Sequence, residues 1–261
     1  MRKGVVPVVA LVLTAVGIAM AMTLASAAAS PVGSSPAPAV PQSQLAEGAD
    51  LYNQSCTSCH GPRGEGSRLS GGMVAPPLIG VGAADVDFYL STGRMPLANT
   101  NESQAIRKPP AYDSTQIAAI VAYVGTFGPG GPAIPLLDQA RASLSRGGEL
   151  YLLNCGACHN AAAIGGALSY GSYAPALHKA TALQIAEAAR VGPGNMPVFG
   201  NETLSDDELN DVVRYVRYLQ HPDDAGGNPL GHLGPVTEGL IGLLFGLGTL
   251  MAYTAWLGTR A

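Results

Sequence analysis

Charged residues are scarce in this chain: they make up 12% of the 261 residues, and the formal net charge is −4. Arg2, Lys3 and Arg260 lie near the ends, outside the apparently globular part, which is therefore more acidic still. A protein that binds nucleic acid presents a basic face to the phosphates. We therefore predict no nucleic-acid partner.

Cysteine is also scarce, and strand patterns are missing. The chain holds four cysteines, and all of them lie in C-x-x-C pairs, so no thiol is left for a structural disulfide. No stretch alternates apolar and polar residues over the length of a strand. The fold class that we predict is therefore mainly α, with helices joined by long loops.

Both cysteine pairs continue into a histidine, as Cys56–His60 (Cys-Thr-Ser-Cys-His) and Cys155–His159 (Cys-Gly-Ala-Cys-His). C-x-x-C-H is the attachment sequence of a c-type haem. Its thiols add across the vinyl groups of one porphyrin, and the histidine becomes an axial iron ligand. A zinc site or a redox dithiol shares the C-x-x-C spacing and is the alternative. We predict two covalently bound haem c groups, attached through Cys56, Cys59, Cys155 and Cys158, with His60 and His159 on the irons.

A methionine loop follows each motif and offers the second axial ligand. Gly93–Pro96 (Gly-Arg-Met-Pro) recurs as Gly194–Pro197 (Gly-Asn-Met-Pro). We therefore predict Met95 as the second axial ligand of haem 1 and Met196 as that of haem 2. Thioether ligation raises the potential of the iron, and a six-coordinate iron favours electron transfer over substrate chemistry. Core packing is the alternative role for both methionines. Met73 is a rival ligand in the first half, but it has no counterpart in the second.

An internal repeat sets the domain limits. Gly48–Tyr52 matches Gly148–Tyr151, and Ala75–Leu78 matches Ala174–Leu177, at the same distance from the respective histidine. Pro76 and Pro175 are therefore candidates to present a backbone carbonyl to that histidine, with a plain turn as the alternative. We predict cytochrome c domains of class I at 47–128 and 146–221, an inter-domain linker at 129–145 and a tether at 222–238.

Helix signals recur within these domains. Capping boxes at Thr181–Gln184 and Ser205–Glu208 predict helix starts. Apolar stripes at helical spacing follow in the last helix of each domain, from Ile117 and from Leu209. The first domain carries an insert at Leu97–Tyr112 beside its methionine. The insert is well placed to touch a redox partner, and a solvated surface loop is the alternative.

Both ends of the chain are apolar. Residues 1–27 read as a secretory signal peptide or an N-terminal membrane anchor, and 28–46 as an Ala/Ser/Pro-rich linker. Residues 239–258 are uncharged and long enough for a transmembrane helix, with Tyr253, Trp256 and Arg260 at one end. We predict a cell-membrane protein whose haem domains lie on the extracytoplasmic side and whose C-terminus is cytoplasmic.

These features resemble a known family. The order of segments and the sequences around each methionine are similar to those of the dihaem cytochrome c subunit (cytochrome cc) of the actinobacterial menaquinol–cytochrome c reductase, the cytochrome bcc complex. The residues that carry the resemblance are Cys56–His60, Ser91–Pro96, Lys108–Pro110, Leu153–Asn160, Gly165–Leu168, Tyr173–Pro175 and Asn195–Pro197.

The resemblance implies an electron-transfer subunit of a quinol–cytochrome c reductase, a translocase of the EC 7.1.1.8 type, with no substrate chemistry of its own. It implies a cytochrome b subunit and a Rieske iron–sulfur subunit as partners in the complex, and an aa3-type cytochrome c oxidase as acceptor. It also implies that the first domain faces the Rieske protein and the second faces the oxidase.

Two alternatives remain at this point. One is a self-contained exported dihaem oxidoreductase of the peroxidase or thiosulfate dehydrogenase type, which usually needs an open or unusual axial position at one haem. The paired Met-Pro loops argue against it. The other is the dihaem subunit of a cbb3-type oxidase, which is anchored ahead of its haem domains, whereas the apolar helix here follows them.

Overall fold

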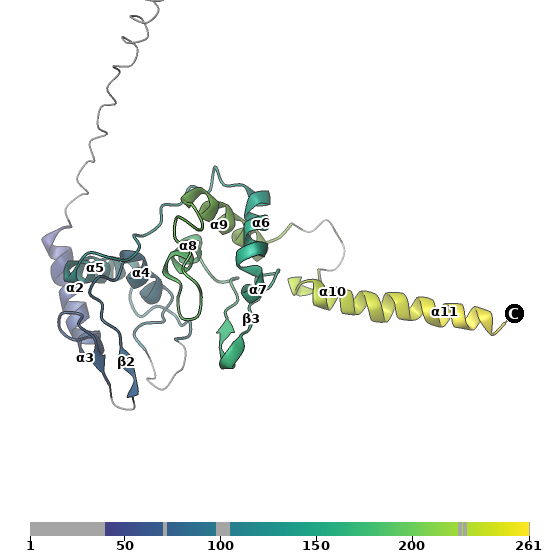
Figure 1. Ribbon diagram of the computed structural model, residues 1–261, viewed down its shortest axis with the longest axis horizontal. Helices are drawn as coiled ribbons and strands as arrows, with labels where there is room; N and C mark the ends of the chain where they lie inside the picture. Colours follow the sequence, from purple (N-terminus) through teal and green to yellow (C-terminus); the bar gives the residue numbers. More distant parts are fainter. Residues whose placement is uncertain (1–39, 70–71, 98–104, 224–225, 227–228, 261) are drawn as a thin grey trace, which may run out of the picture. The chain divides into compact units, whose positions relative to one another are not determined.

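The computed structural model describes residues 40–69, 72–97, 105–223, 226 and 229–260 (Figure 1). The predicted N-terminal segment 1–27 and most of the linker lie outside the described residues. The first described helix, α2 (Gln42–Ser55), begins inside the segment 28–46 that the sequence assigned to the linker. Its start follows the last proline of that segment, Pro41, after which good helix formers take over.

The first half is helical around one apolar core. α2 is followed by α3 (Thr57–His60), α4 (Ala83–Ser91), α5 (Ser114–Val124) and the 3₁₀ turn η2 (Gly125–Phe127). α2 packs along α5, and Asp113 caps α5 by accepting hydrogen bonds from Thr115 N and Gln116 N. The predicted stripe from Ile117 is buried there, as a helix facing a core requires. The core residues are Tyr52, Leu90, Ile117, Ile120 and Val124.

The second half repeats this arrangement. Its elements are α6 (Leu144–Asn154), α7 (Gly156–His159), the 3₁₀ turn η3 (Ser169–Gly171), α8 (Ala182–Val191) and α9 (Asp206–Gln220). α6 packs along α9 as α2 packs along α5. Both predicted capping boxes are confirmed, at Thr181 with Gln184 and at Ser205 with Glu208. Gly192 ends α8 in the left-handed conformation that favours glycine at this position.

Short strands are present where the sequence predicted none. β1 (Ser67–Arg68) pairs antiparallel with β2 (Val74–Ala75), and β3 (Gly166–Ala167) pairs with β4 (Tyr173–Ala174). Two-residue strands leave no alternating pattern in a sequence, which explains why the period-two test missed them. The strands close the loop that follows each C-x-x-C-H motif.

The two halves touch through α4 and α8. Gln184 on α8 donates from Nε2 to the carbonyl of Ser91 at 3.1 Å and accepts from Arg107 Nη2 at 2.8 Å. The linker between the halves is hydrogen-bonded to both of them. Its Pro132 O accepts from Ala84 N of the first half at 3.1 Å, and its Asp138 N donates to Asn210 Oδ1 of the second half at 2.7 Å. The relative placement of the two halves is therefore fixed by polar contacts as well as by packing.

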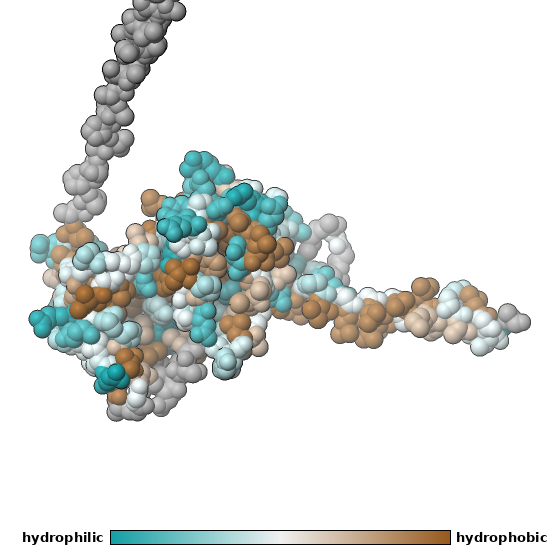
Figure 2. All heavy atoms as spheres, viewed as in Figure 1, coloured by the Kyte–Doolittle hydropathy of each residue, from teal (hydrophilic) through white to brown (hydrophobic). Residues whose placement is uncertain are grey.

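A long apolar helix follows the second half, after a 3₁₀ turn η4 (Leu230–His232). It comprises α10 (Pro235–Ile241), a π-helical stretch η5 (Gly242–Leu247) and α11 (Gly248–Gly258). It spans 24 residues, roughly 36 Å, which exceeds the hydrocarbon core of a bilayer. Figure 2 shows apolar side chains exposed along it. An exposed helix that is apolar all round is typical of a membrane span, and among the described residues this helix alone is long and apolar enough to be one.

A buried carboxyl group lies at the contact between the halves. Glu187 on α8 is 0% exposed. Burial, and then the nearby Asp87 of α4, raise the pKa of Glu187 from the ordinary 4.5 to about 9. Glu187 is therefore protonated in the folded protein at neutral pH.

This shift predicts a stability that falls as the pH rises. Below pH 4.5 the carboxyl is protonated in both the folded and the unfolded chain, so it adds no pH dependence. Between 4.5 and about 9 only the unfolded chain loses the proton, which costs the folded state about 1.4 kcal/mol per pH unit. Glu187→Gln should remove that slope, so its thermal midpoint should exceed that of the wild type by more at pH 8 than at pH 5.

The matched control is Glu202→Gln, which changes an exposed carboxylate of the same domain. Its thermal midpoint should follow the wild type at every pH. A Glu187→Gln chain whose advantage over the wild type is the same at pH 5 and pH 8 would contradict the assignment.

Candidate functional site

Each C-x-x-C-H motif starts a new turn of helix. α6 ends at Asn154, Cys155 lies between the two helices, and α7 runs from Gly156 to His159. His159 N donates to Cys155 O at 2.9 Å, so the motif is wound as one tight turn. The first half does the same between Cys56 and His60, also at 2.9 Å. In each half the histidine therefore ends a short helix, and the first cysteine of the motif separates that helix from the preceding one.

A backbone carbonyl orients each histidine ring. His159 Nδ1 lies 2.9 Å from Pro175 O, and His60 Nδ1 lies 2.9 Å from Pro76 O. The predicted contact of these prolines is thus confirmed in both halves. A carbonyl only accepts, so Nδ1 carries the proton and Nε2 of a neutral ring keeps a free lone pair. Burial lowers the pKa of His159, which favours that neutral, metal-binding form.

The loop that brings Pro175 to the histidine has room for glycine only. Gly165 N donates to His159 O at 2.9 Å, and its φ is +82°. A Cβ at this position would lie 2.4 Å from Ala174 O, directly before the proline. Leu177 N donates to Ala163 O at 2.8 Å and closes the same loop from the other side.

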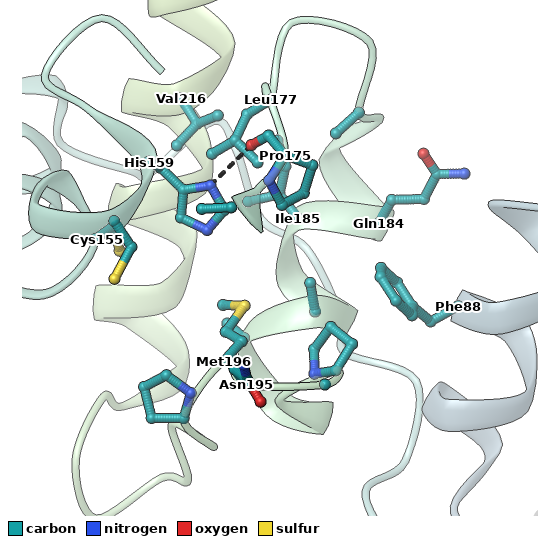
Figure 3. A pocket seen from close by; sticks show the side chains of 18 of the residues that line it. Phe88, Cys155, His159, Pro175, Leu177, Gln184, Ile185, Asn195, Met196 and Val216 are labelled. Atoms are coloured by element: carbon teal, nitrogen blue, oxygen red, sulfur yellow. Dashed lines mark hydrogen bonds between the residues drawn. The ribbon is translucent and has the colours of Figure 1, made fainter. Parts of the chain in front are cut away.

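A cavity of about 340 Å³ opens beside this histidine. Figure 3 shows His159 on one side of it, Met196 on the opposite side, and Cys155 at a third edge. Most of the remaining lining is apolar, contributed by α8, α9 and the loops before them; it includes Leu177, Ile185, Phe199, Val212 and Val216. An apolar slot with a histidine, a methionine and two cysteines on its edges fits a macrocycle that is apolar on its faces and tethered at one edge.

The cysteines do not behave like a redox pair. Burial raises the pKa of Cys56 and of Cys155 to about 11. Redox dithiols instead have a first thiol with a depressed pKa. Zinc would need four ligands. Across the described parts of the chain, no group of three or more His, Cys, Asp or Glu converges. The geometry therefore favours haem attachment over both alternatives.

The first half brings its predicted residues to one core. Cys56 and Met95 both pack against the cluster around Tyr52, as Cys155 and Met196 pack against the cluster around Tyr151. Met73 is half-buried and is not among the described side chains packed on that cluster. The arrangement favours Met95 over Met73 as the candidate ligand.

Two arginines of the first half line the cavity of the second. Arg94 precedes Met95, and Arg107 lies in the insert; both side chains reach the second cavity. Arg107 also donates to Gln184, so this part of the insert contacts the chain itself. The sequence analysis placed Arg107 in an insert suited to touch a redox partner, and it assigned neither arginine to the second cavity. The available signal was the arginine of Gly-Arg-Met-Pro, which the second copy replaces with Asn195.

The fold and the sites define a mainly α c-type cytochrome. Residues 45–127 match the family model described as "Cytochrome c", and 142–216 match that of "Cytochrome C oxidase, cbb3-type, subunit III". The chain therefore holds two cytochrome c domains followed by one candidate membrane helix, as the sequence predicted.

Relatives over most of the chain define the family further. The "Cytochrome bc1 complex cytochrome c subunit" of Corynebacterium efficiens is 41% identical over 84% of this chain and 78% of its own length. That of Mycobacterium tuberculosis (H37Rv) is 42% identical over 83% and 78%. A thiosulfate dehydrogenase of Stutzerimonas stutzeri is 45% identical, but over 16% of this chain only. The chain belongs to the family of cytochrome c subunits of cytochrome bc1 complexes, and its role is electron transport with haem c.

Proposed function

We propose that this chain is the dihaem electron-transfer subunit of a menaquinol–cytochrome c reductase. The observation that carries the proposal is the cavity between His159 and Met196, with its attachment cysteines, together with the matching residues in the first half. In this proposal Cys56, Cys59, Cys155 and Cys158 tether two haem c groups. His60 with Met95, and His159 with Met196, would hold the two irons.

Each bound haem supplies a one-electron iron couple. The residues of the chain set its conditions. With both the histidine and the methionine bound to it, each iron would have no free position for a substrate. Pro76 and Pro175 fix the ring orientation of the histidines. The apolar walls of the second cavity would keep water from a bound haem, which together with a thioether ligand would favour the reduced state.

The route that we propose is supported by the resemblance to the cytochrome bcc family and by the contact between the domains. The chain accepts electrons from the Rieske subunit beside cytochrome b and delivers them to an aa3-type oxidase, with the first domain facing the Rieske protein. Direct packing of α4 on α8 supports transfer within the chain. The local match to thiosulfate dehydrogenase covers too little of the chain to favour an enzyme.

The membrane arrangement is part of the proposal. Helix 235–258 anchors the chain, with the haem domains on the extracytoplasmic side. Arg260 lies 4.1 Å from the ring centroid of Trp256, and Tyr253 stacks on the same ring. Aromatic rings at one end of a span, followed by a cation, are typical of a cytoplasmic interface.

Replacing the second methionine tests the ligand assignment. Met196→Ala removes a thioether that stabilises ferrous iron, so the potential of one haem should fall and transfer to the oxidase should slow. A redox titration followed in the optical spectrum measures this. Met73→Ala is the matched control and should leave both potentials unchanged. Unaltered potentials in Met196→Ala would remove this residue as a ligand.

Removing the apolar helix tests the anchor. A chain without residues 235–258 should lose the apolar surface that holds it in the bilayer, and the haem domains should leave the purified complex. The measurement is the haem c content of the complex relative to haem b. A chain carrying an unrelated apolar helix of equal length is the control and should remain membrane-bound. Full retention of the shortened chain would contradict the role of this helix.

A further inference from the structure

The second cavity has positive charge in its wall, and the described residues that line it carry no negative charge. Arg94 and Arg107 line it, both contributed by the first domain. The described lining includes no aspartate or glutamate. Arg107 is exposed and also donates to Gln184, whereas the Nη1 atom of Arg94 is buried. A cation that is buried without a partner is costly, so proteins pair it with an anion or leave it in water. A wall of this kind indicates an anionic ligand.

Arg94 is the more constrained of the two. Its guanidinium lies over the ring of Phe88, 4.9 Å from the centroid. Its Nη1 atom is buried and has no hydrogen-bond partner in the described structure. A buried guanidinium nitrogen without an acceptor loses its hydration without compensation. Burial, and then the nearby Arg107, lower the pKa of Arg94.

The position of the arginines matches one edge of a haem. In Figure 3 Cys155 lies on one side of the cavity and Phe88, beneath Arg94, on the other. In a haem the vinyl groups that react with cysteines and the two propionate carboxylates sit on opposite edges of the macrocycle. With the vinyl edge tethered at Cys155, the carboxylates would lie on the side of Phe88, which belongs to the first domain. Guanidinium groups bind carboxylates with paired hydrogen bonds.

We propose that Arg94 and Arg107 of the first domain bind a propionate carboxylate of the haem in the second domain. This inference rests on the proposed function, because it requires a haem at Cys155–His159. The second site is then completed by the first domain. The loop that carries Met95 for one iron also holds the carboxylate of the next haem, so the two cofactors are positioned by one shared element.

Neutralising Arg107 in the full-length chain, purified in its complex, tests the pairing. Without this charge the carboxylate is less compensated, and ferric iron is favoured. We expect the ferric-to-ferrous equilibrium of the second haem to shift about tenfold in Arg107→Gln, a fall of about 59 mV for a one-electron couple. The first haem should shift less. Haem identity is assigned from the potential that Met196→Ala moves.

Matched variants separate this effect from a general loss of charge. Arg68→Gln removes an exposed arginine of the same domain and should leave both potentials unchanged. Arg107→Lys keeps the charge and should recover at least half of the shift. Arg94→Gln is an independent second variant and should lower the same potential.

The outcomes are distinct. An unchanged second potential in both Arg107→Gln and Arg94→Gln would overturn the inference, as would a lysine variant equal to the glutamine variant or an equal fall at both haems. In each case the pyridine haemochrome assay should still return two haems per chain. A wild-type chain with fewer than two haems would refute the proposed function itself.

Discussion

The hydrogen bond from each histidine Nδ1 to a proline carbonyl is the contact on which both sites depend. At 2.9 Å in each half, it joins residues sixteen apart and leaves Nε2 as the ring nitrogen that is free to bind a metal. A short hairpin and a glycine at φ +82° shape the second loop so that Pro175 reaches the ring. Much of the loop structure after each motif therefore serves to fix the orientation of one histidine ring.

At the contact between the domains, too, one residue makes several positioning hydrogen bonds. Gln184 caps its own helix through the amide of Thr181 and also accepts from Arg107 and donates to Ser91 of the first domain. The same boundary buries Glu187 beside Asp87 and places Arg94 at the second cavity. Polar groups buried at a contact hold it in one arrangement, because any other arrangement leaves them unpaired. For an electron carrier, a fixed arrangement means a fixed distance between redox centres.

Much of this was readable from the sequence, because local chemistry leaves local signals. The C-x-x-C-H motifs, the capping boxes at Thr181 and Ser205 and the apolar stripes of the last helices follow rules of spacing, and the repeat supplied the proline contacts. The features that were missed are of two kinds. Two are local: strands of two residues are too short to show a period, and the composition of the linker hid the start of α2 after Pro41. The third is non-local. The arginines at the second cavity become visible only when α4 lies on α8, since no spacing rule links residue 94 to residue 155.

The central claim is that the chain carries two iron porphyrins, each joined through thioethers to its own C-x-x-C-H motif. The most direct test is the intact mass of the denatured full-length chain, compared with variants in which Cys155 and Cys158, or Cys56 and Cys59, are replaced by alanine. The account predicts the mass of two haems on the wild type and of one on each variant. A wild-type mass with one haem or none, under conditions that remove every non-covalent group, would contradict it.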